Sequence, residues 1–173
     1  MKKMIEKTIR ALVMDVDGTL TDGGIYLGNS GEELKRFYVR DGLAIKHILP
    51  EYGIVPIVIT GRSSALVSRR CEELDIADVV QGCGDKLAAL ERMLAEKGIS
   101  FGETAYIGDD VNDLECMKKA GLSGCPADAV KDVLETADYV CSNRGGYGAV
   151  REFIDHIIST QPAKNSEQDK KQK

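Results

Sequence analysis

The sequence contains few of the residues on which several classes of protein depend. Its 173 residues include two histidines, His47 and His156, so a metal site built from imidazole ligands is not expected. Lys and Arg number 23 against 28 Asp and Glu, and the formal net charge of -5 argues against a general nucleic-acid or anionic-membrane surface. The five cysteines form no CxxC pair, and their odd number favours a reducing cytoplasm over a disulfide framework.

Long apolar runs and glycine-rich phosphate loops are also missing. The basic start MKKMIEKTIR leads into only a few apolar residues before Asp15, so neither a signal peptide nor a membrane span is predicted. A Walker-type loop, or a GxGxxG motif after a strand, would cradle a phosphate, and the sequence has neither. Any anionic substrate must therefore be held by other local groups.

Apolar strand-like runs alternate with helix-like segments from Ile9 to about Ile158. This alternation is typical of βαβ units and predicts an α/β fold of three layers, a Rossmann-like parallel sheet with helices on both faces. One domain over residues 1–160 and a polar, disordered tail at 161–173 are expected. The predicted strands are 9–15, 54–59, 78–81, 104–107, 121–125 and 138–141, and the predicted helices are 41–49, 63–74, 84–97, 111–120, 128–136 and 147–159.

Residues 24–39 depart from this alternation of strands and helices. Two short strand-like runs flank the turn-forming Asn29-Ser30-Gly31, which predicts a β-hairpin after the first strand. The exposed edges of such a hairpin would invite pairing with another chain.

Four of the predicted strands end in polar residues that carry chemistry. Because the carboxyl ends of parallel strands meet at one edge of a sheet, these residues are expected to share one crevice. They are Asp15 and Asp17 in MDVDGTL, Thr60 and Gly61 after IVPIVI, Lys86 after the third strand, and Asp109, Asp110 and Asp113 in YIGDDVND.

Carboxylates at the end of a buried strand are costly unless a positive group lies among them. A hard cation with oxygen ligands would meet this need, and Mg²⁺ takes few carboxylates while keeping some waters. A turn or helix N-cap is the competing reading of DVDG. A calcium loop is excluded, because Leu20 and Tyr26 stand where its Gly and Glu belong.

These features, in this order, resemble the haloacid dehalogenase superfamily, whose signatures are DxDGT, a strand-end Thr or Ser, a Lys and a GDDxxD-type acidic turn. The resemblance covers nearly the whole chain and implies a Mg²⁺-dependent phosphatase that works through an aspartyl-phosphate. The resemblance implies that Asp15 is the nucleophile and Asp17 the general acid and base, and that Thr60, the Gly61 amide and Lys86 bind the phosphate. It also implies that Asp15, Asp17 (through a backbone carbonyl) and Asp109 are metal ligands, and that Asp110 and Asp113 support the metal site.

Members of this superfamily usually carry a cap domain after the first motif or after the Thr motif, and neither interval here has room for one. Four stretches, FYVRDGLAIK, TGRSSALVSRRC, GLSGCPADA and RGGYGAVREF, look like the capless 3-deoxy-octulosonate 8-phosphate phosphatases and their relatives that act on nonulosonate 9-phosphates. That branch implies a phosphorylated sugar acid as substrate and a homotetramer formed around the hairpins. Its implied substrate-binding residues are Arg40, Asp41, Arg62 and Arg70.

Other functions compete with the octulosonate phosphatase. GLSGCPADA and Asn112 also resemble nonulosonate-type phosphatases and the C-terminal domains of some sialic acid cytidylyltransferases. The latter suggest a non-catalytic tetramerisation module. Such a module would not require all five of Asp15, Asp17, Thr60, Lys86 and Asp109. A phosphatase acting on proteins is a third hypothesis, and the sequence gives no sign of a peptide groove.

Overall fold

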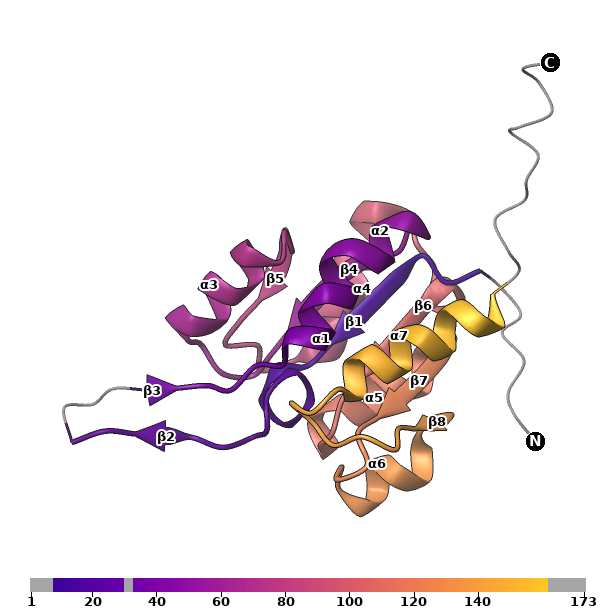
Figure 1. Cartoon of the computed structure of the whole chain (residues 1–173). Helices are drawn as coiled ribbons and strands as arrows, with labels where there is room; N and C mark the ends of the chain where they lie inside the picture. The colour runs from indigo at the N-terminus through magenta and orange to yellow at the C-terminus, as the bar shows by residue number, and fades with distance from the viewer. Residues whose placement is uncertain (1–7, 30–32, 162–173) are drawn as a thin grey trace.

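The computed structural model describes residues 8–29 and 33–161. Most of the predicted tail and the tip of the predicted hairpin lie outside these described residues. Within them, six parallel strands form one sheet in the order β5-β4-β1-β6-β7-β8 (Figure 1). The strands are β1 (Ala11–Met14), β4 (Val55–Ile59), β5 (Asp78–Val80), β6 (Thr104–Ile107), β7 (Leu122–Cys125) and β8 (Tyr139–Val140). The predicted α/β fold class is confirmed.

Strand β1 lies in the middle of the sheet because its residues are apolar on both faces. All four are buried, and Val13 pairs with Ile57 of β4 on one side and with Tyr106 of β6 on the other. The chain passes to opposite sides of β1 when it builds β4 and β6, so the carboxyl end of β1 is a switch point of the sheet, where ligands bind in open α/β folds.

The side chains of β1 alternate between two hydrophobic cores. Leu12 and Met14 join the core that contains residues of α3 and α7, whereas Ala11 and Val13 join the core that contains residues of α4, α5 and α6. The helical segments are η1 (Val16–Leu20), α1 (Val39–Leu43), η2 (Ala44–Ile48), α2 (Leu49–Glu51), α3 (Ala65–Glu73), α4 (Lys86–Lys97), η3 (Phe101–Glu103), η4 (Val111–Asp113), α5 (Leu114–Lys119), α6 (Lys131–Thr136) and α7 (Ala149–Thr160).

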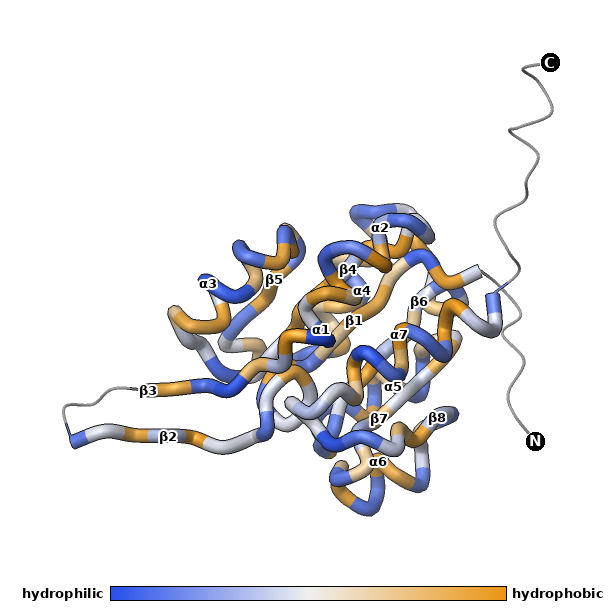
Figure 2. The backbone as a smooth tube through the Cα atoms, viewed as in Figure 1, coloured by the Kyte–Doolittle hydropathy of each residue, from blue (hydrophilic) through white to orange (hydrophobic). Residues whose placement is uncertain are grey.

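The predicted hairpin is an arm that projects from the body of the domain (Figure 1). β2 (Tyr26–Leu27) pairs antiparallel with β3 (Glu33–Leu34), and a bridge between Thr21 and Phe37 closes the base of the arm. Leu27 and Leu34 are 73% and 63% exposed, and Figure 2 shows the hydrophobic colour on both strands of the arm.

Some predicted boundaries differ from the structure. Residues 41–49 were expected to form one helix, but the chain forms the consecutive segments α1, η2 and α2 over 39–51. The segment expected at 111–120 begins with the single 3₁₀ turn η4. All five cysteines are free thiols. Within the described part of the chain, no helix combines the length and apolarity needed to span a bilayer.

Candidate active site

The loop after β1 brings carboxylates together by a sharp turn at Gly18. Gly18 has φ of 88°, in the left-handed region, and a Cβ on it would lie 2.1 Å from Oδ2 of Asp109. The missing side chain therefore lets the Asp109 carboxylate approach the loop backbone closely. The Thr19 hydroxyl, which is buried, donates a hydrogen bond of 2.9 Å to Oδ1 of Asp109 and fixes that carboxylate.

Three carboxylates meet at the carboxyl ends of β1 and β6. Asp15, Asp109 and Asp113 each offer an oxygen, and the three oxygens lie within 4.8 Å of one another. Asp15 is only 5% exposed and Asp113 is fully buried. Such a cluster of hard oxygen atoms suits Mg²⁺.

Asp113 differs from the other two carboxylates because donors surround it. Its Oδ1 accepts from Nζ of Lys86 at 2.8 Å and from the hydroxyl of Tyr106 at 2.6 Å. Its Oδ2 accepts from the backbone amides of Asp109 and Asp110 at 3.2 and 3.3 Å. Asp113 therefore organises its neighbours and has little capacity left for a cation.

Asp15 has the opposite environment. Nζ of Lys86 lies 3.0 Å from its Oδ1, yet this buried oxygen receives no well-directed hydrogen bond from any described residue. Burial, and then the charge of Asp113, raise the pKa of Asp15 to about 6, while Lys86 lowers it. The pKa of Asp109 rises to about 7 through burial and the charge of Asp15. The cluster is thus short of positive charge, and a divalent cation held by Asp15 and Asp109 fits it.

Lys86 supplies a buried ammonium group to the cluster, since its side chain is only 3% exposed. It is the first residue of α4, whose N-terminus is capped by Asp85 accepting from the amide of Ala88 at 3.0 Å. Its ammonium lies between Asp15 and Asp113, and these two charges raise the pKa of Lys86 above its ordinary value although burial alone would lower it.

Thr60 and Gly61 lie at the end of β4, as expected from the sequence. Thr60 is buried, its amide donates to the carbonyl of Val80 at 2.9 Å, and its carbonyl accepts from the amide of Cys83 at 3.0 Å. These bonds join the loop after β4 to the loop after β5, from which Lys86 comes. Gly61 is exposed beside this junction.

The side chain of Asp17 lies outside the three-carboxylate cluster. Its Oδ1 contacts the ammonium of Lys35, on the arm after β3, and its Oδ2 lies 3.9 Å from Nε of Arg62. The Asp17 side chain is 24% exposed, so solvent reaches it. Sequence reasoning missed Lys35, whose place on the predicted hairpin gave no sign of this contact.

The four predicted substrate-binding residues are distributed differently. Arg62 reaches Asp17, whereas Arg70 pairs with Glu73 at 2.8 Å and lies over the ring of Phe37. Asp41 is buried, and its Oδ1 accepts from the amide of Arg151 in the first turn of α7 at 2.8 Å. Burial raises the pKa of Asp41 to about 6. The structure thus gives Asp41 and Arg70 contacts within the protein, and their role in substrate binding stays a prediction.

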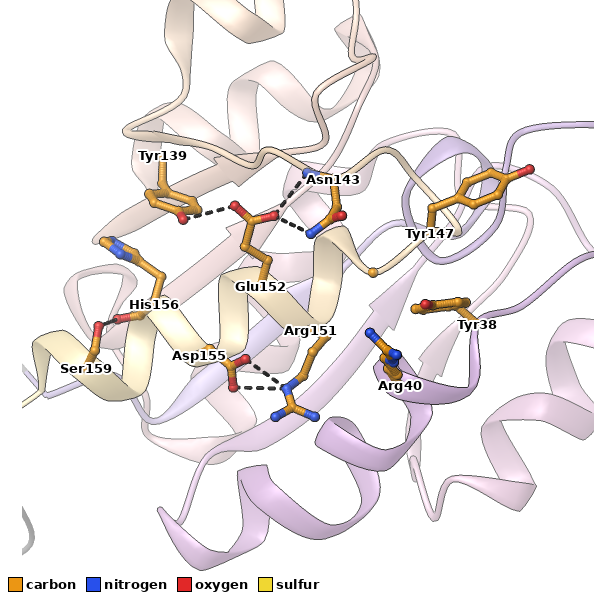
Figure 3. A pocket seen from close by; sticks show the side chains of 11 residues that line it. Tyr38, Arg40, Tyr139, Asn143, Tyr147, Arg151, Glu152, Asp155, His156 and Ser159 are labelled. Atoms are coloured by element: carbon orange, nitrogen blue, oxygen red, sulfur yellow. Dashed lines mark hydrogen bonds and ion pairs between the residues drawn. The ribbon is translucent and has the colours of Figure 1, made fainter.

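Arg40 lies in a hollow of about 480 Å³ on the outer side of α7. In Figure 3 its guanidinium lies beside the ring of Tyr38, and Tyr147 is on the far side of that ring. The carboxylate of Glu152, on the opposite wall, accepts hydrogen bonds from the backbone amide and the side-chain amide of Asn143. This hollow is separate from the carboxylate cluster.

The glycine-rich loop before α7 packs directly on the loop after β1. The amide of Gly146 donates to the carbonyl of Thr19 at 3.1 Å, and the guanidinium of Arg36 donates to the carbonyl of Gly146 while lying 3.9 Å from the ring centre of Tyr147. A glycine-rich stretch at 144–148 was visible in the sequence, but its contact with residues near the start of the chain was not. The contact braces the loop that carries Asp15.

Gly145→Ala is expected to lower the free energy of unfolding by about 1–3 kcal/mol, the usual cost of overpacking. The added Cβ would lie 1.8 Å from the carbonyl oxygen of Gly18, so the loop after β1 must shift. Urea unfolding measures the loss. Gly84→Ala is the matched control, because a Cβ there meets nothing within 4 Å, and equal losses in the two variants would contradict the packing argument.

Comparison with known proteins agrees with this geometry. The sequence pattern of the haloacid dehalogenase-like hydrolases matches residues 71–154. A parallel sheet with carboxylates and a lysine at its strand ends is the arrangement that the sequence predicted for a hydrolase of this class.

Relatives of known name extend the match over most of the chain. The 3-deoxy-D-manno-octulosonate 8-phosphate phosphatase KdsC of Salmonella typhi is 46% identical over 155 residues, which are 90% of this chain and 82% of the relative. The crystal structure of the same phosphatase from Yersinia pestis has a TM-score of 0.86 and 46% identity, and the match covers 88% of this chain and 82% of the other.

A second solved structure carries ligands. The phosphatase of Moraxella catarrhalis, in complex with a magnesium ion, a phosphate ion and a KDO molecule, has a TM-score of 0.85 and 42% identity, covering 88% of this chain and 87% of that one. The chain therefore belongs to the 3-deoxy-D-manno-octulosonate 8-phosphate phosphatase family of haloacid dehalogenase-like hydrolases. The predicted family is confirmed.

Proposed function

We propose that this protein hydrolyses 3-deoxy-D-manno-octulosonate 8-phosphate to the free sugar acid and inorganic phosphate. The observation that carries the proposal is that Asp15 and Lys86, which are buried, and Asp109, which is half-buried, meet at the carboxyl ends of the strands. The names of the relatives and the magnesium, phosphate and KDO bound in one of them support the substrate and the need for Mg²⁺. The proposed catalytic domain is residues 1–160.

The proposed reaction has two displacements. A carboxylate oxygen of Asp15 attacks the phosphorus, the bond from phosphorus to the sugar oxygen breaks, and Asp17 gives that oxygen a proton. Asp17 then takes a proton from a water molecule, whose oxygen attacks the phosphorus and releases phosphate and Asp15. The partial exposure of Asp17 is compatible with contact to a leaving alcohol.

The remaining residues would bind the metal ion and the phosphoryl group. Bound Mg²⁺ would neutralise the carboxylates and the phosphoryl group, with Asp15, Asp109 and the backbone carbonyl of Asp17 as its protein ligands. Asp110 and Asp113 would support this site. The proposed phosphoryl ligands are the hydroxyl of Thr60, the amide of Gly61 and the ammonium of Lys86.

Comparison of substrates tests the proposal. With Mg²⁺ present, kcat/KM should be higher for 3-deoxy-D-manno-octulosonate 8-phosphate than for a nonulosonate 9-phosphate. The reverse order would favour the nonulosonate alternative. Absence of Mg²⁺-dependent turnover on both sugars and on p-nitrophenyl phosphate would favour the non-catalytic tetramerisation module.

The arm of β2 and β3 is the proposed tetramer contact, and a neighbouring subunit would then cover an otherwise capless site. Its exposed leucines support this proposal.

The five free thiols, four of them buried, support a cytoplasmic location.

Leu27→Lys is expected to convert the tetramer into smaller species, because a lysine would be buried without a partner at the contact. Leu27 is 73% exposed in the single chain, so the fold should be unaffected. Light scattering gives the mass of the particle. Val140→Lys, on the exposed edge strand β8, is the control, and a tetramer that survives Leu27→Lys would refute the role of the arm.

A further inference from the structure

Tyr106 is a buried polar side chain for which the proposed reaction has no use. It lies in the middle of β6 among the residues of the core formed with α4 and α5, and its exposed fraction is 0%. A phenylalanine would fill almost the same volume without burying a hydroxyl group. Since an unpaired hydroxyl would be costly there, the hydrogen bond that it donates to a carboxylate is informative.

That bond ends on Asp113, the carboxylate that organises the site. The Tyr106 hydroxyl donates to Oδ1 at 2.6 Å, and Lys86 donates to the same oxygen at 2.8 Å. The other oxygen accepts from the amides of Asp109 and Asp110. A carboxylate held on both oxygens cannot rotate without breaking bonds at both ends, so the hydroxyl and the Lys86 ammonium together fix the plane of Asp113.

The two ends of Asp113 lead to different parts of the site. Oδ2 accepts a hydrogen bond from the amide of Asp109, so the orientation of the Asp113 carboxylate determines the position of the Asp109 backbone. The Asp109 side chain belongs to the cluster that suits a cation. Oδ1 accepts a hydrogen bond from the ammonium of Lys86 and so determines its position. The same ammonium lies 3.0 Å from Oδ1 of Asp15. Close packing leaves little room for compensation, because a Cβ on Gly108 would lie 2.3 Å from Cγ of Asp113.

We propose that Tyr106 is a positioning residue, whose hydroxyl orients Asp113 and through it both the Asp109 carboxylate and the Lys86 ammonium. This inference deepens the proposed function and rests on it for the effect on turnover. Its effect on cation binding depends on the described contacts alone. The Tyr106 hydroxyl keeps the proton that it donates, because burial and the charge of Asp113 raise the pKa of Tyr106 well above its ordinary value.

The test is Tyr106→Phe in the full-length protein, with Tyr139→Phe as the matched control. The Tyr139 hydroxyl also donates to a carboxylate, that of Glu152 at 3.2 Å, but on the hollow beside α7. For Tyr106→Phe, kcat should fall about tenfold, equivalent to about 1.4 kcal/mol, with little change in KM. The dissociation constant of Mg²⁺, measured by calorimetry without substrate, should rise about threefold to tenfold. Tyr139→Phe should leave both quantities within about twofold of the parent.

A double-mutant cycle with Asp113→Asn shows whether the hydroxyl acts through Asp113. In the Asp113→Asn background, Tyr106→Phe should weaken Mg²⁺ binding much less than in the parent, since the oriented carboxylate is already lost. Additive losses would overturn the proposal. So would unchanged kcat and Mg²⁺ affinity in Tyr106→Phe, or a variant that fails to fold, which would assign the hydroxyl to stability.

The outcomes separate this inference from the proposed function. If the parent protein hydrolyses none of the sugar phosphates but Tyr106→Phe still weakens Mg²⁺ binding in a way that depends on Asp113, the function is wrong and the positioning role stands. If the parent is an active phosphatase and Tyr106→Phe matches it in both kcat and Mg²⁺ affinity, the positioning role is wrong and the function stands.

Discussion

Asp15→Asn is expected to reduce kcat/KM by at least roughly a thousandfold, on the order of 4 kcal/mol of transition-state stabilisation. A carboxamide is a poor nucleophile, and the change also removes one negative charge from the cluster that would hold Mg²⁺. Initial rates on p-nitrophenyl phosphate and on 3-deoxy-D-manno-octulosonate 8-phosphate, with saturating Mg²⁺, measure the loss.

Asp132→Asn is the control for this experiment, because Asp132 is exposed in the first turn of α6. It should keep the activity of the parent. Thermal unfolding should show that Asp15→Asn remains folded, which links its loss to chemistry. Turnover by Asp15→Asn within about tenfold of the parent would remove Asp15 from the role of nucleophile.

Lys86→Met is expected to lower the free energy of unfolding by about 3–5 kcal/mol and to abolish turnover. Methionine has a similar length and no charge, so Asp15 and Asp113 would stay buried without the ammonium that lies 3.0 and 2.8 Å from them. Urea unfolding measures the loss of stability. The control is Lys97→Met, which breaks a more exposed ion pair with Asp78 and should cost less than about 1 kcal/mol.

The cost of Lys86→Met should depend on pH when Mg²⁺ is absent. The pKa of Asp15 in the folded parent, about 6, is already above its ordinary value of 3.8, and it rises further once Lys86 no longer lowers it. A raised folded-state pKa means that stability is lost as pH rises through that window and recovered as pH falls. The difference between variant and parent should therefore be largest above about pH 6 and shrink toward about pH 4. A pH-independent difference would contradict the electrostatic explanation.

Much of the fold could be predicted because each strand carries its own signal. The apolar run before Asp15 is buried on both faces, and the predicted strand 104–107 has the observed bounds of β6. The meeting of Asp15, Lys86 and Asp109 followed from one rule, that parallel strands end at the same edge of a sheet.

What the sequence could not supply were contacts set by tertiary packing. No pattern in the sequence indicated that Asp41 would accept a hydrogen bond from the amide of Arg151, 110 positions away, and its role as a substrate ligand stays a prediction. Tyr106 looked like an ordinary strand residue, because periodicity gives the face of a strand and says nothing of what a hydroxyl meets there. The segment 41–49 was placed correctly, yet its division into α1, η2 and α2 depends on local bonds that have no clear pattern in the sequence.

The bracing of the first loop by the glycine-rich loop before α7 has a consequence for biosynthesis. All the proposed catalytic residues, from Asp15 to Asp113, are synthesised before Gly145, Gly146 and α7. A nascent or truncated chain would carry every reactive group while its nucleophile loop was still unsupported. Full activity should thus appear only after the last helix has docked, which would keep incomplete chains from acting as phosphatases.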